Sequence, residues 1–156
     1  MPGTTFSPTF EFTLMTIPSI GVDVAPIPVG LDENRIPIVP KHDVGWYELG
    51  SVPTRGENIV FWGHVLRWLD SPDIPAPFAN VKDLPLGSDI YIYTANGAEH
   101  HYQTTNAVQV LPSQVEYVLP TGKEQVTLVS CIGDNVIVDG TLTKQYRLVT
   151  IAEPVR

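Results

Sequence analysis

The sequence contains a single cysteine among its 156 residues, so an internal disulfide is excluded. Basic residues are also few, because nine Lys and Arg stand against 17 Asp and Glu, which gives a net charge of -8 at pH 7. Phosphate binding needs clustered basic residues, so this balance argues against a nucleic-acid partner. No apolar run approaches the ~18 residues of a membrane helix. What remains is one globular domain, long enough to bury a core.

Proline is abundant, whereas helix-period stretches are rare. Prolines that favour extended backbone break up the first quarter of the chain, namely Pro18, Pro26, Pro28, Pro37 and Pro40. With many short alternating runs, this pattern predicts an all-β architecture in which several strands lie at sheet edges or start at proline. We expect a short helix at Gly45–Gly50, a helical turn at Phe78–Leu84 and a hairpin turn at Asn96-Gly97.

The only cysteine ends a strand-like run, Thr127 to Cys131. Strand alternation gives this run two faces, Val126, Leu128 and Ser130 on one and Thr127, Val129 and Cys131 on the other. The segment Gly133-Asp134-Asn135 follows, and we expect the strand to stop there. A thiol at the end of a strand is held rigidly yet is open to a substrate. The simpler interpretation of a lone cysteine is a small buried hydrophobic residue.

Two other strand-like runs carry residues that suit a reactive thiol. His64 closes the run 58–64 directly after a glycine, and Arg147 opens the run 147–151. Fifteen residues separate Cys131 from Arg147, and we expect them to form a loop. A single cysteine with a distant histidine is typical of a nucleophilic thiol, because neighbours in space need not be neighbours in sequence. An arginine adds positive charge that stabilises a developing oxyanion.

In this order and spacing, the runs resemble the motifs of the sortase family. The segment Thr-Leu-Val-Ser-Cys at 127–131 is similar to the family signature TLxTC, with Ser in place of the second Thr. Residues 61–64 resemble the end of the family's histidine strand, and residues 147–149 resemble its arginine strand. Two upstream segments, 17–23 and 44–47, resemble the first strand and the segment before the histidine strand. The resemblance covers nearly the whole chain and is nearest to class E and F sortases.

The resemblance implies a closed eight-stranded sortase-type β-barrel with a few short helices. It assigns residues 17–156 to the catalytic domain and leaves residues 1–16 as an N-terminal arm or an appended remnant. Within this arm, Phe10, Phe12 and Leu14 alternate with polar residues, so we expect a short strand or an arm lying on the barrel.

The resemblance also implies a cysteine transpeptidase that cleaves an LPXTG-like sorting signal after Thr through a thioacyl-enzyme. Cys131, His64 and Arg147 would be the catalytic residues, with Ser130 and Thr127 binding the substrate. The thioacyl group would then pass to an amine acceptor, which is a peptidoglycan cross-bridge or a pilin lysine. We expect no cofactor. Some sortases bind calcium, but no acidic spacing in this sequence specifies a metal site.

Sortases act at the outer face of the cell membrane, so the resemblance implies an anchor in the longer protein, of which this chain would be a fragment. The choice between LPXTG and LAXTG motifs would depend on the loops Val65–Pro77 and Ile132–Tyr146. Two alternatives from other classes remain. Under these alternatives the chain would be either a non-catalytic barrel that binds a peptide at a sheet edge or a structural surface module with a buried cysteine.

Four other features have ordinary explanations. His42 is expected at the surface of a loop, and His100 and His101 face opposite sides of a strand, so they cannot serve one site. The segment Leu119-Pro120-Thr121-Gly122 is similar to a shortened sorting signal, but it is best explained as a turn.

Overall fold

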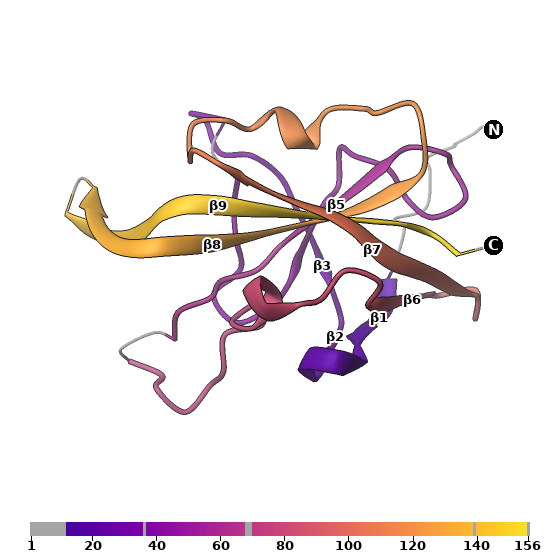
Figure 1. Cartoon of the computed structure of the whole chain (residues 1–156), viewed down its shortest axis with the longest axis horizontal. Coiled ribbons are helices and arrows are strands. Elements are labelled where there is room, and N and C mark those ends of the chain that lie inside the picture. Colours follow the sequence, from indigo (N-terminus) through magenta and orange to yellow (C-terminus); the bar gives the residue numbers. More distant parts are fainter. Residues whose placement is uncertain (1–11, 36, 68–69, 139, 156) are drawn as a thin grey trace, which may run out of the picture.

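The computed structural model describes residues 12–35, 37–67, 70–138 and 140–155. Within these ranges the chain forms nine strands and three short 3-10 helices (Figure 1). The strands are β1 (Phe12–Ile17), β2 (Val22–Val24), β3 (Ile27–Val29), β4 (Gly45–Tyr47), β5 (Asn58–Trp62), β6 (Asp89–Thr94), β7 (Glu99–Val110), β8 (Gln125–Val138) and β9 (Thr141–Pro154). The helices are η1 (Pro18–Ile20), η2 (Val81–Asp83) and η3 (Glu116–Val118). None of the helices in these ranges has the length and apolar character needed to span a bilayer.

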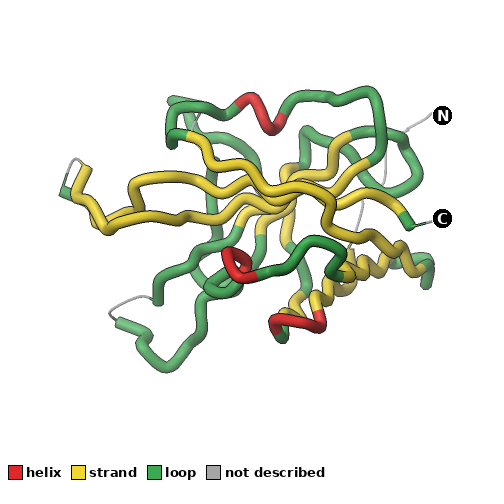
Figure 2. The backbone as a smooth tube through the Cα atoms, viewed as in Figure 1, coloured by secondary structure: helices red, strands yellow, loops and turns green. Residues whose placement is uncertain are grey.

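All nine described strands join one sheet in the order β2-β1-β6-β7-β9-β8-β5-β4-β3. The sheet is strongly curled (Figure 2), so strands far apart in this order meet across the core. The ring of Phe12 on β1 lies edge-on to Trp46 on β4 and to Phe61 on β5, with ring centroids 5.0 and 5.5 Å apart. The predicted all-β, barrel-like architecture is therefore confirmed, with nine described strands where eight were expected.

Several local predictions are also confirmed. Pro28 lies in β3, at one edge of the sheet, where its missing N–H removes no interior ladder bond. The helical turn expected at Phe78–Leu84 is present as η2. The Gly97 N–H donates to the Thr94 carbonyl at 2.9 Å, which closes the hairpin between β6 and β7. The strand expected around Phe12 is β1, whereas Phe10 lies outside the described residues.

The helix predicted at Gly45–Gly50 is wrong. Residues Gly45–Tyr47 form β4, which pairs with β3 on one side and β5 on the other. Trp46 points into the main core, while Tyr47 packs against Trp62 on the opposite face of the sheet. Pairing with two neighbouring strands supplies backbone hydrogen bonds that a helix of one or two turns cannot match, so the tertiary context overrides the local pattern.

The strand predicted to stop at Gly133 continues instead, and the loop predicted between Cys131 and Arg147 is a β-hairpin. The register of β8 against β9 shifts between Ile132 and Asn135, where Gly133 adopts φ 92°. Glycine tolerates this conformation, so a bulge absorbs the unpaired residues and pairing resumes beyond it. The distal part of this hairpin projects beyond the body of the molecule (Figure 1).

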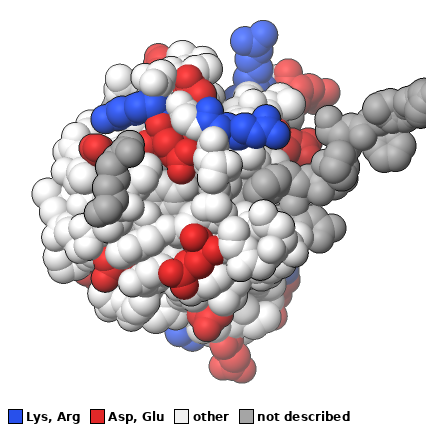
Figure 3. All heavy atoms as spheres, turned by 90° about the vertical axis from the view of Figure 1, so that its right-hand side faces the viewer, with Lys and Arg blue, Asp and Glu red and all other residues white. Residues whose placement is uncertain are grey.

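Charged side chains are dispersed over the surface that faces the viewer in Figure 3. Basic side chains along its upper edge lie beside acidic ones, and most of this face is uncharged. The net charge of -8 is therefore not concentrated in one patch on this face.

Candidate active site

The pairing of β8 with β9 sets Cys131 directly opposite Arg147. Both side chains are half-buried. The Arg147 guanidinium donates through Nη1 to the carbonyls of Lys144 and Tyr146, at 3.1 and 3.2 Å, and through Nη2 to Thr143 Oγ1 at 3.4 Å. These bonds hold the guanidinium against its own strand of the hairpin, and its positive charge acts on the Cys131 thiol.

The parallel pairing of β5 with β8 brings His64 to the level of the thiol. Trp62 pairs with Val129, and Gly63 donates its N–H to the Val129 carbonyl at 3.4 Å. The pairing ends at Trp62, and the same register continued by two residues sets His64 at about the level of Cys131. The three residues therefore lie on or next to the neighbouring strands β5, β8 and β9, with Cys131 and Arg147 in the middle of their strands and His64 just beyond the end of β5.

Burial and positive charge set the protonation states at this site. Burial raises the pKa of the Cys131 thiol, and the positive charges of Arg147 and Lys144 oppose that shift. Burial also lowers the pKa of His64; the hydrogen bond to the Val39 backbone opposes this shift, and the charges of Arg147 and His42 add to it. At neutral pH the pair therefore rests as an uncharged thiol and a neutral imidazole.

We predict that alkylation of Cys131 in the folded protein accelerates only at high pH. Because the pKa of the thiol is raised, the thiolate forms at a higher pH than in an ordinary cysteine, whose pKa is about 8.5. The measurement is the rate of iodoacetamide addition by intact mass spectrometry across the alkaline range. The control is the same chain unfolded in guanidinium. The prediction would be contradicted if the pH midpoint of the alkylation rate in the folded protein were at or below that of the unfolded chain.

Gly63 allows close packing behind the histidine. A Cβ at this position would lie 2.7 Å from the ring of Phe78, which is fully buried. The Phe78 N–H also donates to the His64 carbonyl at 3.0 Å. The ring of His64 is further oriented by a hydrogen bond to the backbone of Val39. The chain at His64 is therefore held between the core and a loop.

We predict that Gly63→Ala destabilises the protein by about 1 to 3 kcal/mol, the usual cost of overpacking a core. The physical reason is the contact of the added methyl group with the buried ring of Phe78. Urea denaturation measures the effect. Gly30→Ala is the matched control, because its Cβ would meet no atom closer than 4.0 Å. Equal stability of Gly63→Ala and wild type would contradict the prediction.

The two residues predicted to bind substrate lie on opposite faces of β8, as the alternation predicted. Ser130 shares the inward face with Leu128, is 2% exposed, and its Oγ has no hydrogen-bond partner within the described part of the chain. Thr127 shares the face of Cys131 but is 1% exposed. Its hydroxyl donates to Asn58 Oδ1 at 2.5 Å and accepts from Gln125 at 3.0 Å. Substrate binding by either residue stays a prediction.

An aromatic cluster lies on the face of the sheet that carries Cys131, and the sequence did not indicate it. Trp62 and Val129 lie on the same face as Cys131, and Tyr47 and Tyr117 pack against this pair from either side. The alternation of β5 signals an outward Trp62, but Tyr117 belongs to η3, in the connection between β7 and β8. No local pattern assigns such a residue to a site.

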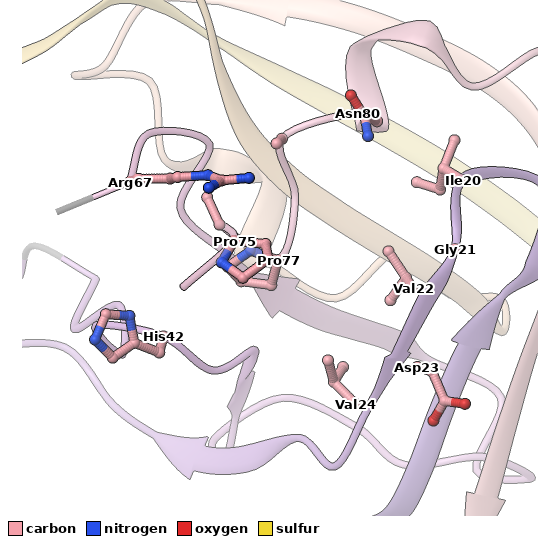
Figure 4. A pocket seen from close by; sticks show the side chains of 12 residues that line it. Ile20, Gly21, Val22, Asp23, Val24, His42, Arg67, Pro75, Pro77 and Asn80 are labelled. Atoms are coloured by element: carbon pink, nitrogen blue, oxygen red, sulfur yellow. The ribbon is translucent and has the colours of Figure 1, made fainter. Parts of the chain in front are cut away.

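A pocket of about 450 Å³ lies beside the segment that follows His64 (Figure 4). The residues Ile20 to Val24 line one side of it, and His42, Arg67, Pro75 and Pro77 line another. None of the five predicted site residues lines this pocket. His42, predicted at the surface, is half-buried. Across the described ranges no group of three or more His, Cys, Asp or Glu side chains is placed to hold a metal ion.

Comparison with solved structures supports the curled all-β fold. Sortase A from Corynebacterium diphtheriae superposes with a TM-score of 0.71 at 22% identity, over 94% of this chain and 61% of that chain. Sortase C1 from Streptococcus agalactiae gives a TM-score of 0.69 at 23% identity, over 92% of this chain and 66% of that chain. At these identities the similarity concerns the fold.

Sequence comparison adds the family. The family model described as Sortase domain matches residues 15–155, nearly the whole chain, and the chain therefore belongs to the sortase family. Sortase A of Bacillus anthracis is 34% identical over 55 residues, which are 35% of this chain. That match spans about a quarter of the curated protein, since it covers 26% of its length.

Proposed function

We propose that this chain is a sortase-type transpeptidase whose catalytic residues are Cys131, His64 and Arg147. One observation carries the proposal. The only thiol of the chain lies directly opposite an arginine on β9, and the parallel register of β5 sets a histidine at the same level. Membership of the sortase family supports the same activity.

In the first step the sulfur of Cys131 attacks the threonine carbonyl of an LPXTG-like signal. The thiol proton passes to His64, a sulfur–carbon bond forms, and the carbonyl oxygen gains negative charge. Arg147 stabilises that oxyanion through its fixed positive charge. His64 then gives the proton to the glycine nitrogen as the Thr–Gly bond breaks, which leaves a thioacyl-enzyme.

In the second step an acceptor amine attacks the thioacyl carbon. His64 takes a proton from that amine, the new amide bond forms, and the sulfur–carbon bond breaks. Cys131 recovers its proton from His64, so the resting uncharged pair is restored. Water in place of the amine would give hydrolysis.

We propose an LPXTG-like sorting signal as the substrate because the chain belongs to the sortase family. Trp62 and Val129, on the face of β5 and β8 that carries Cys131, are 2% and 3% exposed, so they pack beneath the site and offer no surface to a peptide. We further propose a peptidoglycan cross-bridge or a pilin lysine as acceptor, and a site of action at the outer face of the cell membrane. We also propose that the chain belongs to the class E or class F sortases.

The experiment is intact mass spectrometry of the protein mixed with LPXTG and LAXTG peptides, with and without triglycine. A covalent adduct on Cys131 and a triglycine-dependent product are expected, and the preferred peptide identifies the motif. No adduct while the folded thiol still alkylates would show that the substrate class is wrong. No adduct together with a thiol that alkylates only after unfolding would favour a non-catalytic binding or structural module.

A further inference from the structure

The pocket of about 450 Å³ shares a wall with the backbone of the candidate histidine. The Phe78 N–H donates to the His64 carbonyl at 3.0 Å, and the chain neighbours of Phe78, Pro77 and Ala79, both line the pocket. The segment that forms one side of the pocket is therefore bonded directly to His64.

Arg67 makes a second connection between the pocket and the histidine. It lines the pocket and follows His64 by three residues. Three residues of fully extended chain span at most about 11 Å, so the backbone of Arg67 lies within that distance of His64. An extended tripeptide has about the same length. A short peptide with its amine at His64 is therefore long enough to reach Arg67.

The guanidinium of Arg67 determines which chemical group suits the pocket. Its Nη1 donates to the Pro72 carbonyl at 2.9 Å, which holds the side chain against its own loop. In Figure 4 the guanidinium extends toward the middle of the pocket, whereas the Asp23 carboxylate points away from it. A guanidinium has five N–H donors and binds a carboxylate through two parallel hydrogen bonds. The pocket therefore suits a ligand that carries a carboxylate.

We propose that this pocket binds the amine acceptor of the transfer reaction and that Arg67 pairs with a carboxylate of that acceptor. This inference rests on the proposed function, in which His64 takes a proton from the attacking amine. The amine then lies at His64, and the carboxylate lies in the pocket about one tripeptide length away. The acceptor class is a short peptide amine with a free carboxylate. Arg67 is a binding residue in this arrangement, because it does not touch the reacting atoms.

The test measures transfer of the preferred sorting-signal peptide to triglycine and to triglycinamide. These two acceptors present the same amine and differ only in the C-terminal carboxylate. Wild type should have a KM for triglycine on the order of 10-fold below its KM for triglycinamide, the scale of a charge-assisted hydrogen bond. Arg67→Ala should raise the KM for triglycine by about that factor and leave the KM for triglycinamide within about threefold of wild type. The kcat should change little, because the lost contact is the same in the ground state and the transition state.

Two further variants make the result specific to the charge of Arg67. Arg67→Glu should weaken triglycine more than Arg67→Ala does, because it places a negative charge beside the acceptor carboxylate. Arg55→Ala removes an exposed arginine from the turn before β5 and should change neither KM. Equal KM changes for the two acceptors in the Arg67 variants, or no change for either, would overturn the pocket proposal and leave the transpeptidase function intact. A wild type that forms no thioacyl-enzyme would overturn both.

Discussion

Replacing Cys131 with alanine is expected to abolish both the covalent adduct with a sorting-signal peptide and the transfer of that peptide to an amine. No other thiol is present in the chain, so no residue can replace this nucleophile. The side chain is half-buried at the end of the aromatic face, so its truncation removes little packing and the fold should persist.

Circular dichroism and the urea midpoint of Cys131→Ala establish that the variant is folded before its activity is compared. Cys131→Ser is the conservative control, because it keeps a hydrogen-bonding group of similar size but a far weaker nucleophile at neutral pH. Cleavage of the peptide by folded Cys131→Ala at more than a trace of the wild-type rate would end the proposed mechanism.

Replacing Arg147 with alanine is expected to lower kcat/KM on the order of 10²-fold to 10³-fold, the scale of removing an oxyanion donor. The variant should also raise the pKa of Cys131 further, because the Arg147 charge opposes the shift that burial causes. The alkylation profile should then move to higher pH. Transfer kinetics and iodoacetamide rates measure these two effects separately.

Two control variants separate the effect of the Arg147 charge from that of its hydrogen bonds and from the loss of any arginine. Arg147→Lys keeps the charge but loses the planar group that bonds to the Lys144 and Tyr146 carbonyls, so it should recover the alkylation profile more fully than the transfer rate. Arg55→Ala removes an exposed arginine from the turn before β5 and should change neither. Near-normal transfer by Arg147→Ala would remove that residue from the site.

The pKa directions at Cys131 and His64 bear on how the site operates. Both groups are held in their uncharged forms by burial, so attack must be coupled to the movement of the thiol proton to the imidazole. The positive charges of Arg147 and Lys144 favour the thiolate once it forms. In the proposed mechanism the thiol is therefore uncharged at rest and loses its proton as it attacks.

The local pattern of the chain was sufficient to locate the strands that carry the site, but not where β8 ends or where β9 begins. Alternation alone separated Cys131 from Ser130, because successive side chains of any strand point to opposite faces. The prolines predicted that several strands lie at sheet edges, because a residue without an N–H weakens an interior ladder. Pro28 does lie in an edge strand, β3. The candidate residues His64, Cys131 and Arg147 also came from the sequence, through motifs that end or begin apolar runs.

Tertiary structure decided the features that depend on partners distant in the chain. Gly45–Tyr47 became a strand because β3 and β5 lie on either side of it, and Gly133 became a bulge because β9 continues opposite β8. Tyr117 packs against the sheet because Asn58 and Trp62, about sixty residues earlier, bind its backbone and its phenol. Such contacts depend on which strands pair, and pairing is a long-range property that no local window of sequence contains.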